Sequence, residues 1–135
     1  MIILDTSALY ALLRDEDAMC RQVFASLRGE PALVVSPYVV AELDHLFLSR
    51  YGVSAELQVL EELASGNYEL PVLGAADLLA CAGIVAKFCD HDIGVTDASL
   101  VVLANRYGTD RICTLDRRHF SILRTLDGAP FTLLP

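Results

Sequence analysis

The sequence predicts an α/β fold in which helices cover both faces of a central, mostly parallel sheet. Short apolar runs at residues 1–4, 33–35 and 111–115 alternate with longer segments whose apolar residues have helical spacing. Short, continuous apolar strands that alternate with helices are typical of a parallel sheet buried on both sides. The length of 135 residues fits one domain, spanning residues 1–135, with a core of its own.

The first predicted element is a strand over residues 1–4, the apolar run Met-Ile-Ile-Leu. A helix starts at Asp5-Thr6-Ser7, and a second helix ends near residue 27. Residues 33–35, Leu-Val-Val, form the next buried strand. Ser36 is then placed to cap a helix, and Pro37 suits its first position.

This third helix runs over residues 38–51 and ends at Gly52. Ser54 is expected to cap a fourth helix that ends near residue 64. Residues 68–72 are expected to form a strand, and residues 75–88 form an apolar helix.

In the last third of the chain, residues 89–95 form a connection, and Thr96 is expected to cap a helix that ends before Gly108. The strand 111–115 follows, then a short turn over residues 117–120. Residues 131–134 complete the sheet as an edge strand.

Composition narrows the class of protein. The net charge of −8 argues against a nucleic-acid surface built on general basicity, although acids in a metal site would contribute to this sum. The hydrophobic fraction of 54% exceeds what a small monomer requires and suggests a covered surface. No apolar run reaches the length of a membrane span, and no signal peptide is visible, so we expect a cytoplasmic protein. The four cysteines lack paired spacing and are expected to remain thiols.

Four carboxylates stand where strands end or helices begin: Asp5, Glu42, Asp97 and Asp116. Ligands of open α/β sheets bind beyond the carboxyl ends of the strands, and all four acids can reach that edge. At about 4 Å and an effective dielectric constant of about 20, each like-charged pair costs roughly 4 kcal/mol. Each acid alone also suits a turn, a cap or a solvated helix. Together they indicate a site for a divalent cation.

The segments that carry these acids resemble the successive motifs of a known family. They are Ile-Leu-Asp-Thr-Ser-Ala-Leu (3–9), Val-Ala-Glu-Leu (40–43), Thr-Asp-Ala-Ser (96–99) and Thr-Leu-Asp-Arg-Arg-His-Phe (114–120). In this order and spacing they resemble PIN-domain nucleases, and more narrowly the VapC toxins of VapBC toxin–antitoxin pairs. The resemblance covers nearly the whole chain.

The resemblance implies a metal-dependent endoribonuclease that uses Mg²⁺ or Mn²⁺ and cleaves tRNA or rRNA to arrest translation. Asp5, Glu42, Asp97 and Asp116 match the family's acidic positions. Asp5 and Asp97 are the first choices as direct ligands. Asp116 and Glu42 could bind directly, bind through water, or orient the nucleophile. The resemblance also implies a VapB-type antitoxin in a hetero-oligomer, in which the antitoxin tail lies between the N-terminal helices, and a homodimer of the toxin.

Further residues have two readings each. Ser7 and Thr114 resemble the family's hydroxyl positions and could hydrogen-bond a carboxylate, or serve as cap and strand residues. Arg117 and Arg118 could contact RNA phosphates or be solvated surface residues. His119 is expected in a loop rather than as a general base. Asp92 could be a fifth acid, although a turn suits it better.

Other functions fit the sequence less well. A phosphoacceptor receiver domain needs a lysine late in the sheet, and the single lysine, Lys87, lies in a helical segment. A haloacid-type phosphatase needs a second acid where Ser7 stands. The remaining alternative is a catalytically silent PIN-like protein-binding module, which the complete set of acids disfavours.

Overall fold

The computed structural model describes residues 1–135 and contains one four-stranded sheet. The strands have the order β2-β1-β3-β4, and every neighbouring pair is parallel. Their bounds are β1 Ile2–Leu4, β2 Leu33–Val35, β3 Arg111–Cys113 and β4 Thr132–Leu134. The prediction of a parallel sheet, with the last strand at its edge, is confirmed.

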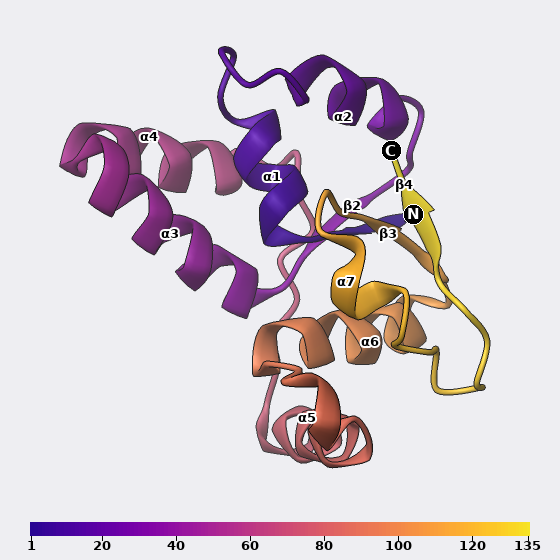
Figure 1. Cartoon of the computed structure of the whole chain (residues 1–135). Coiled ribbons are helices and arrows are strands. Elements are labelled where there is room, and N and C mark those ends of the chain that lie inside the picture. The colour runs from indigo at the N-terminus through magenta and orange to yellow at the C-terminus, as the bar shows by residue number, and fades with distance from the viewer.

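Helices lie on both faces of this sheet, also as predicted (Figure 1). In the view of Figure 1, α1 and α2 lie above the sheet, α6 and α7 lie below it, and α5 packs against the outer side of α6. The helices α3 and α4 form a hairpin beside α1. Their bounds are α1 Thr6–Leu12, α2 Cys20–Leu27, α3 Pro37–Tyr51, α4 Val53–Leu63, α5 Ala75–Lys87, α6 Val95–Tyr107 and α7 Arg117–Phe120, with a 3₁₀ turn, η1, at Cys89–His91.

The core is built around β1, which has a strand on each side and helices above and below. Ile2, Ile3 and Leu4 are therefore fully buried, as are Leu100 and Leu103 of α6. Burying one such side chain contributes about 1.5–3 kcal/mol. A rigid β1 fixes the position of the residue that follows it, Asp5.

Two helix boundaries agree with their sequence signals. The Ser36 hydroxyl accepts a hydrogen bond from the Tyr38 amide at 3.2 Å, and Pro37 is the first residue of α3. Gly108 ends α6 with φ of 62°, a left-handed conformation that glycine adopts without strain.

Ser54 and Thr96 were expected as helix caps, and both expectations are wrong. Gly52, with φ of 86°, ends α3 and directly precedes α4, so α4 already begins at Val53. Gly94 has extended backbone and precedes α6, which places Thr96 inside the first turn. In both cases a glycine two residues earlier occupies the N-cap position.

The strand expected at residues 68–72 is reduced to a single bridge. Glu69 exchanges two backbone hydrogen bonds with Leu33 and Val35 of β2, and the pairing stops there. Pro71 has no amide to extend it, and Val72 is 84% exposed. The expected turn at residues 117–120 is instead the one-turn helix α7. No helix of the structure has the length and apolar character needed to cross a membrane.

Candidate active site

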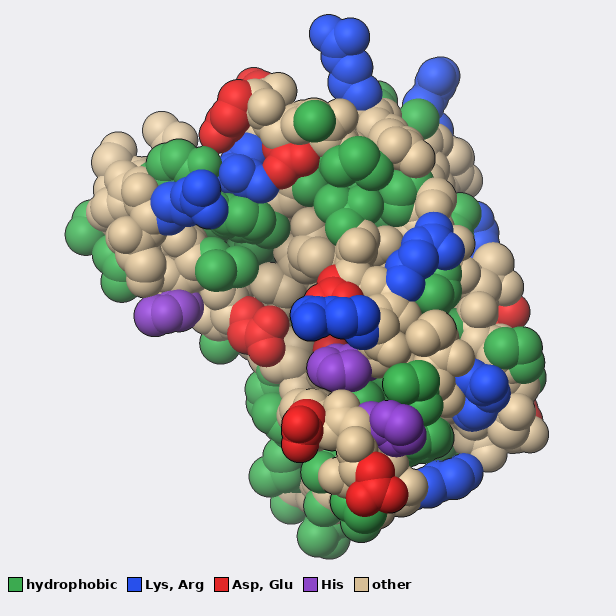
Figure 2. Space-filling model, viewed as in Figure 1, with side chains coloured by type: hydrophobic (Ala, Val, Ile, Leu, Met, Phe, Trp, Pro, Cys, Tyr) green, Lys and Arg blue, Asp and Glu red, His purple; other side chains and the backbone are tan.

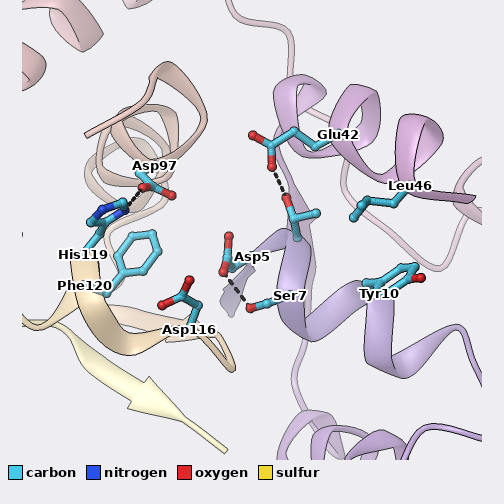
Figure 3. Close-up of a pocket in the computed structure, with 10 residues that line it drawn as sticks. Asp5, Ser7, Tyr10, Glu42, Leu46, Asp97, Asp116, His119 and Phe120 are labelled. Atoms are coloured by element: carbon cyan, nitrogen blue, oxygen red, sulfur yellow. Dashed lines mark hydrogen bonds and ion pairs between the residues drawn. The ribbon is translucent and has the colours of Figure 1, made fainter. Parts of the chain in front are cut away.

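A cavity of about 430 Å³ opens at the carboxyl ends of β1 and β3, between α3 and α6 (Figure 3). All four predicted acids line it. The complete lining is Asp5, Thr6, Ser7, Tyr10, Glu42, Leu46, Asp97, Asp116, His119 and Phe120. Figure 2 shows acidic, basic and histidine side chains gathered near the middle of this face, where the surface is hollowed.

Four separate segments deliver the acids to this cavity. Asp5 directly follows β1, and Glu42 lies in the second turn of α3. Asp97 is the third residue of α6, and Asp116 precedes α7 as its N-cap. In Figure 3, Asp5 lies between Glu42 on one side and Asp97 and Asp116 on the other.

Asp5 is the most buried of the four, with 7% of its surface exposed. The hydroxyls of Ser7 and Thr114 both donate to its Oδ2, at 2.8 Å and 2.7 Å. Burial raises the pKa of Asp5; the two hydroxyls oppose this rise and the charge of Glu42 adds to it. Ser7 and Thr114 therefore make the hydrogen bonds that their positions suggested.

Asp97 has an imidazole partner that the sequence did not reveal. The Nδ1 of His119 lies 2.6 Å from Asp97 Oδ2, and both side chains face the cavity (Figure 3). Burial is the main cause that raises the pKa of Asp97, and the charges of Asp5 and Glu42 raise it further. His119 was expected in a loop; it lies instead in α7, because Asp116 caps that turn.

Asp116 is partly exposed and is the only one of the four acids that is bonded to an arginine. Arg118 donates from Nε to Oδ1 at 2.9 Å and from Nη2 to Oδ2 at 2.5 Å. These hydrogen bonds lower the pKa of Asp116 to about 2. Arg117 points elsewhere: its Nη2 donates to the carbonyl oxygen of Pro135, and it does not line the cavity.

Glu42 is held by Thr6, a second residue that sequence reasoning missed. The Thr6 hydroxyl donates to Glu42 Oε2 at 2.9 Å, which links α1 to α3 across the cavity. The sequence does place the Thr6 hydroxyl next to Asp5 at the start of α1, and therefore near the acids. Only the packing of α1 on α3 shows which acid it contacts.

Asp92 does not join the site. It ends η1 in a left-handed conformation, with φ of 51°, and is absent from the cavity lining. Aspartate is one of the few residues that adopts this conformation readily, so the turn reading holds. The four cysteines are free thiols, and Cys81 and Cys113 are buried as expected.

The donor chemistry of the cavity fits a hard divalent cation, since carboxylate oxygens are the ligands that Mg²⁺ and Mn²⁺ prefer. Asp5 is buried and Asp97 is half-buried beside other acids, and a bound cation would favour the ionised form of each. In the arrangement described here, no three carboxylate, imidazole or thiol groups converge on one point. An ion bound directly by three or more of these groups would therefore require their side chains to move closer together.

Comparisons with known proteins agree with this geometry. The pattern of the PIN domain family matches residues 2–125. The chain is 52% identical to Ribonuclease VapC26 of Mycobacterium tuberculosis over 138 aligned residues, covering 99% of this chain and all of that protein.

Solved structures show the same fold at low sequence identity. VapC20 of M. tuberculosis, described as a sarcin-ricin loop cleaving toxin, has a TM-score of 0.77 at 19% identity and covers 86% of this chain and 90% of its own. VapBC2 from Rickettsia felis, bound to a DNA fragment from its promoter, has a TM-score of 0.74 at 14% identity and covers all of both chains. FitAcB from Neisseria gonorrhoeae has a TM-score of 0.62 at 19% identity and covers 100% of this chain and 97% of its own. With its parallel sheet, its four acids at one edge and these relatives, the chain belongs to the PIN-domain family, among the VapC ribonucleases.

Proposed function

We propose that this protein is a Mg²⁺-dependent endoribonuclease and the toxin of a VapBC toxin–antitoxin pair. In this proposal it hydrolyses phosphodiester bonds of tRNA or rRNA in the cytoplasm and thereby arrests translation. The observation that carries the proposal is the convergence of Asp5, Glu42, Asp97 and Asp116 on one cavity. The 52% identity to a named ribonuclease supports the same activity.

The roles of the acids follow from their burial and contacts. Asp5 and Asp97 are the proposed direct ligands of Mg²⁺ or Mn²⁺, since burial disfavours their charged forms in the absence of a cation. Ser7 and Thr114 both bind Oδ2 of Asp5 and hold the carboxylate in one orientation. When bound, the ion would lower the pKa of a water nucleophile and stabilise the leaving oxygen.

Glu42 and Asp116 complete the proposed site from opposite sides. Glu42 is oriented by Thr6, and Asp116 by its place at the start of α7. Each could bind the ion directly, bind it through water, or orient the nucleophile. His119 restrains Asp97 through Nδ1, as imidazoles and carboxylates around metal sites commonly restrain one another.

The proposed partners are a VapB-type antitoxin and a second copy of the chain. A cavity of about 480 Å³ with Leu12, Leu13, Phe24 and Leu27 in its lining lies beside α1 and α2, where an antitoxin tail would fit. Exposed apolar side chains on α5, Leu78 and Leu79, offer a surface for the second copy. Light scattering of the toxin alone and with its antitoxin tests both assignments.

Cleavage of total RNA by the purified protein tests the activity. We expect cutting with Mg²⁺, none with a chelator, and loss of cutting in Asp5→Asn. The matched control is Asp77→Asn, which changes one half-buried aspartate on α5 away from the cavity. Equal cutting with and without chelator would contradict the proposal, and no cutting of any RNA would favour the silent binding module. Sequencing the RNA ends would identify the substrate.

A further inference from the structure

Arg118 occupies both oxygens of Asp116, one of the four acids of the site. Its Nε and Nη2 bind Oδ1 and Oδ2, at 2.9 Å and 2.5 Å. The arginine side chain is 81% exposed and that of Asp116 is 43% exposed, so the pair stands at the mouth of the cavity. Ion pairs that are this exposed contribute little to stability. The two hydrogen bonds of the pair therefore have good geometry, but another partner can replace either residue at little cost in free energy.

The other three acids have different partners. Asp5 accepts hydrogen bonds from hydroxyls, Glu42 from the Thr6 hydroxyl, and Asp97 contacts an imidazole. No lysine or arginine lines the cavity. Arg118 is thus the one permanent cation bonded to the acid cluster, and the acid that it binds stands partly exposed at the mouth of the cavity.

We propose that Arg118 neutralises Asp116 in the metal-free protein and moves to a phosphate oxygen of the RNA when the loaded site binds substrate. This inference rests on the proposed function and assigns Arg118 the role of a substrate-binding residue. A guanidinium forms the same two parallel hydrogen bonds with a phosphate as with a carboxylate, so one residue can serve both partners. The exchange frees both oxygens of Asp116 when the ion requires them.

The neighbouring arginine does not share this role. Arg117 donates to the carbonyl oxygen of Pro135 at 2.6 Å, which turns it away from the acids. The sequence offered Arg117 and Arg118 equally as phosphate contacts. The structure selects Arg118, because only its side chain reaches a carboxylate of the site.

Binding of Mn²⁺, followed by electron paramagnetic resonance without RNA, tests the first half of the inference. Arg118→Ala removes the competitor for Asp116, so we expect Mn²⁺ to bind about two- to fivefold more tightly than in the parent. Arg21→Ala is the control. It removes the same charge from an exposed position on α2, and its Mn²⁺ affinity should equal that of the parent.

Cleavage kinetics at saturating Mg²⁺ test the second half. We expect Arg118→Ala to lower kcat/KM about tenfold or more, since the variant loses hydrogen bonds between two charged groups when RNA binds. Arg118→Lys should recover part of the loss, and Arg21→Ala should cut like the parent. Circular dichroism of each variant checks that it is folded.

The two measurements must move in opposite directions for the inference to stand. Unchanged or weaker Mn²⁺ binding in Arg118→Ala would refute the competition. Tighter Mn²⁺ binding with unchanged cleavage would refute the transfer to RNA. If the parent itself cuts no RNA, the proposed function fails and the transfer fails with it, while the Mn²⁺ measurement still reports on the competition at Asp116.

Discussion

Replacing Asp5 with asparagine should make the metal-free protein more stable while it abolishes cleavage. Asp5 is 7% exposed, and burial together with the charge of Glu42 raises the pKa of its carboxyl group. At neutral pH the folded state therefore contains an ionised group that would be better solvated in the unfolded chain. The neutral amide removes this penalty and has nearly the same shape.

The size of the effect depends on whether the hydrogen bonds survive. Ser7 and Thr114 both donate to the same oxygen, Oδ2, so the single amide oxygen can accept both while the amide nitrogen faces the cavity. Losing one of these two hydrogen bonds would lower the free energy of unfolding by about 1 kcal/mol. With both retained, we expect a gain of roughly 1 kcal/mol in the free energy of unfolding. For a chain of 135 residues this corresponds to a rise of about 4 °C in Tm.

The pH dependence has a definite sign. A carboxyl group with a raised folded pKa binds more protons in the folded state, so its unfavourable contribution develops as pH rises from 3.8 through the folded pKa. The advantage of Asp5→Asn should therefore be greatest at neutral pH and should disappear below pH 3.8, where the parent carboxyl is protonated in both states.

Thermal unfolding by circular dichroism, in chelator and in Mg²⁺, measures both effects. A ligand at 100 times its Kd stabilises the folded state by about 2.7 kcal/mol. In Mg²⁺ the parent should gain this stabilisation and become more stable than Asp5→Asn, which should gain little. Asp77→Asn is the control, because hydrogen bonds to Gly74 and Arg106 lower the pKa of Asp77 and its neutral variant should be no more stable than the parent. A Tm of Asp5→Asn at or below that of the parent in chelator would refute the reasoning.

Three further predictions concern single contacts. His119→Asn keeps a donor near the position of Nδ1 and should retain the Mn²⁺ affinity of the parent, whereas His119→Gln should bind Mn²⁺ about tenfold more weakly, because its amide cannot reach Asp97 in the same way. Equal Mn²⁺ affinities of the two variants would contradict this. Thr6→Val should lower kcat/KM roughly two- to tenfold by releasing Glu42, and Thr6→Ser should stay near the parent value. If Thr6→Val were as active as Thr6→Ser, the Thr6 hydroxyl would have no role in cleavage. Leu100→Ala should lower the free energy of unfolding by about 2–5 kcal/mol, measured by urea denaturation, since Leu100 is fully buried; a loss below that range would show that the cavity collapses.

The elements that the sequence predicted well are those with strong local signals. Ser36 and Pro37 define the start of α3, and Gly108 defines the end of α6, because each residue satisfies or frees backbone groups within one turn. The prediction of a strand at residues 68–72 was wrong, although the apolar residues of this segment resemble those of a buried strand. Pairing requires a neighbour along its whole length, and β2 offers one only at Glu69.

The sequence by itself determined which four acids share a site, because the carboxyl ends of parallel strands and the starts of the following helices meet at one edge of a sheet. It also placed Ser7 and Thr114 beside them. Only the tertiary structure decided the partners of those acids. Thr6 meets Glu42 across 36 positions, and His119 meets Asp97 across 22. Such contacts depend on how α1 packs on α3 and on where α7 lies relative to α6. No local pattern encodes that packing, and the same holds for the choice of Arg118 over Arg117.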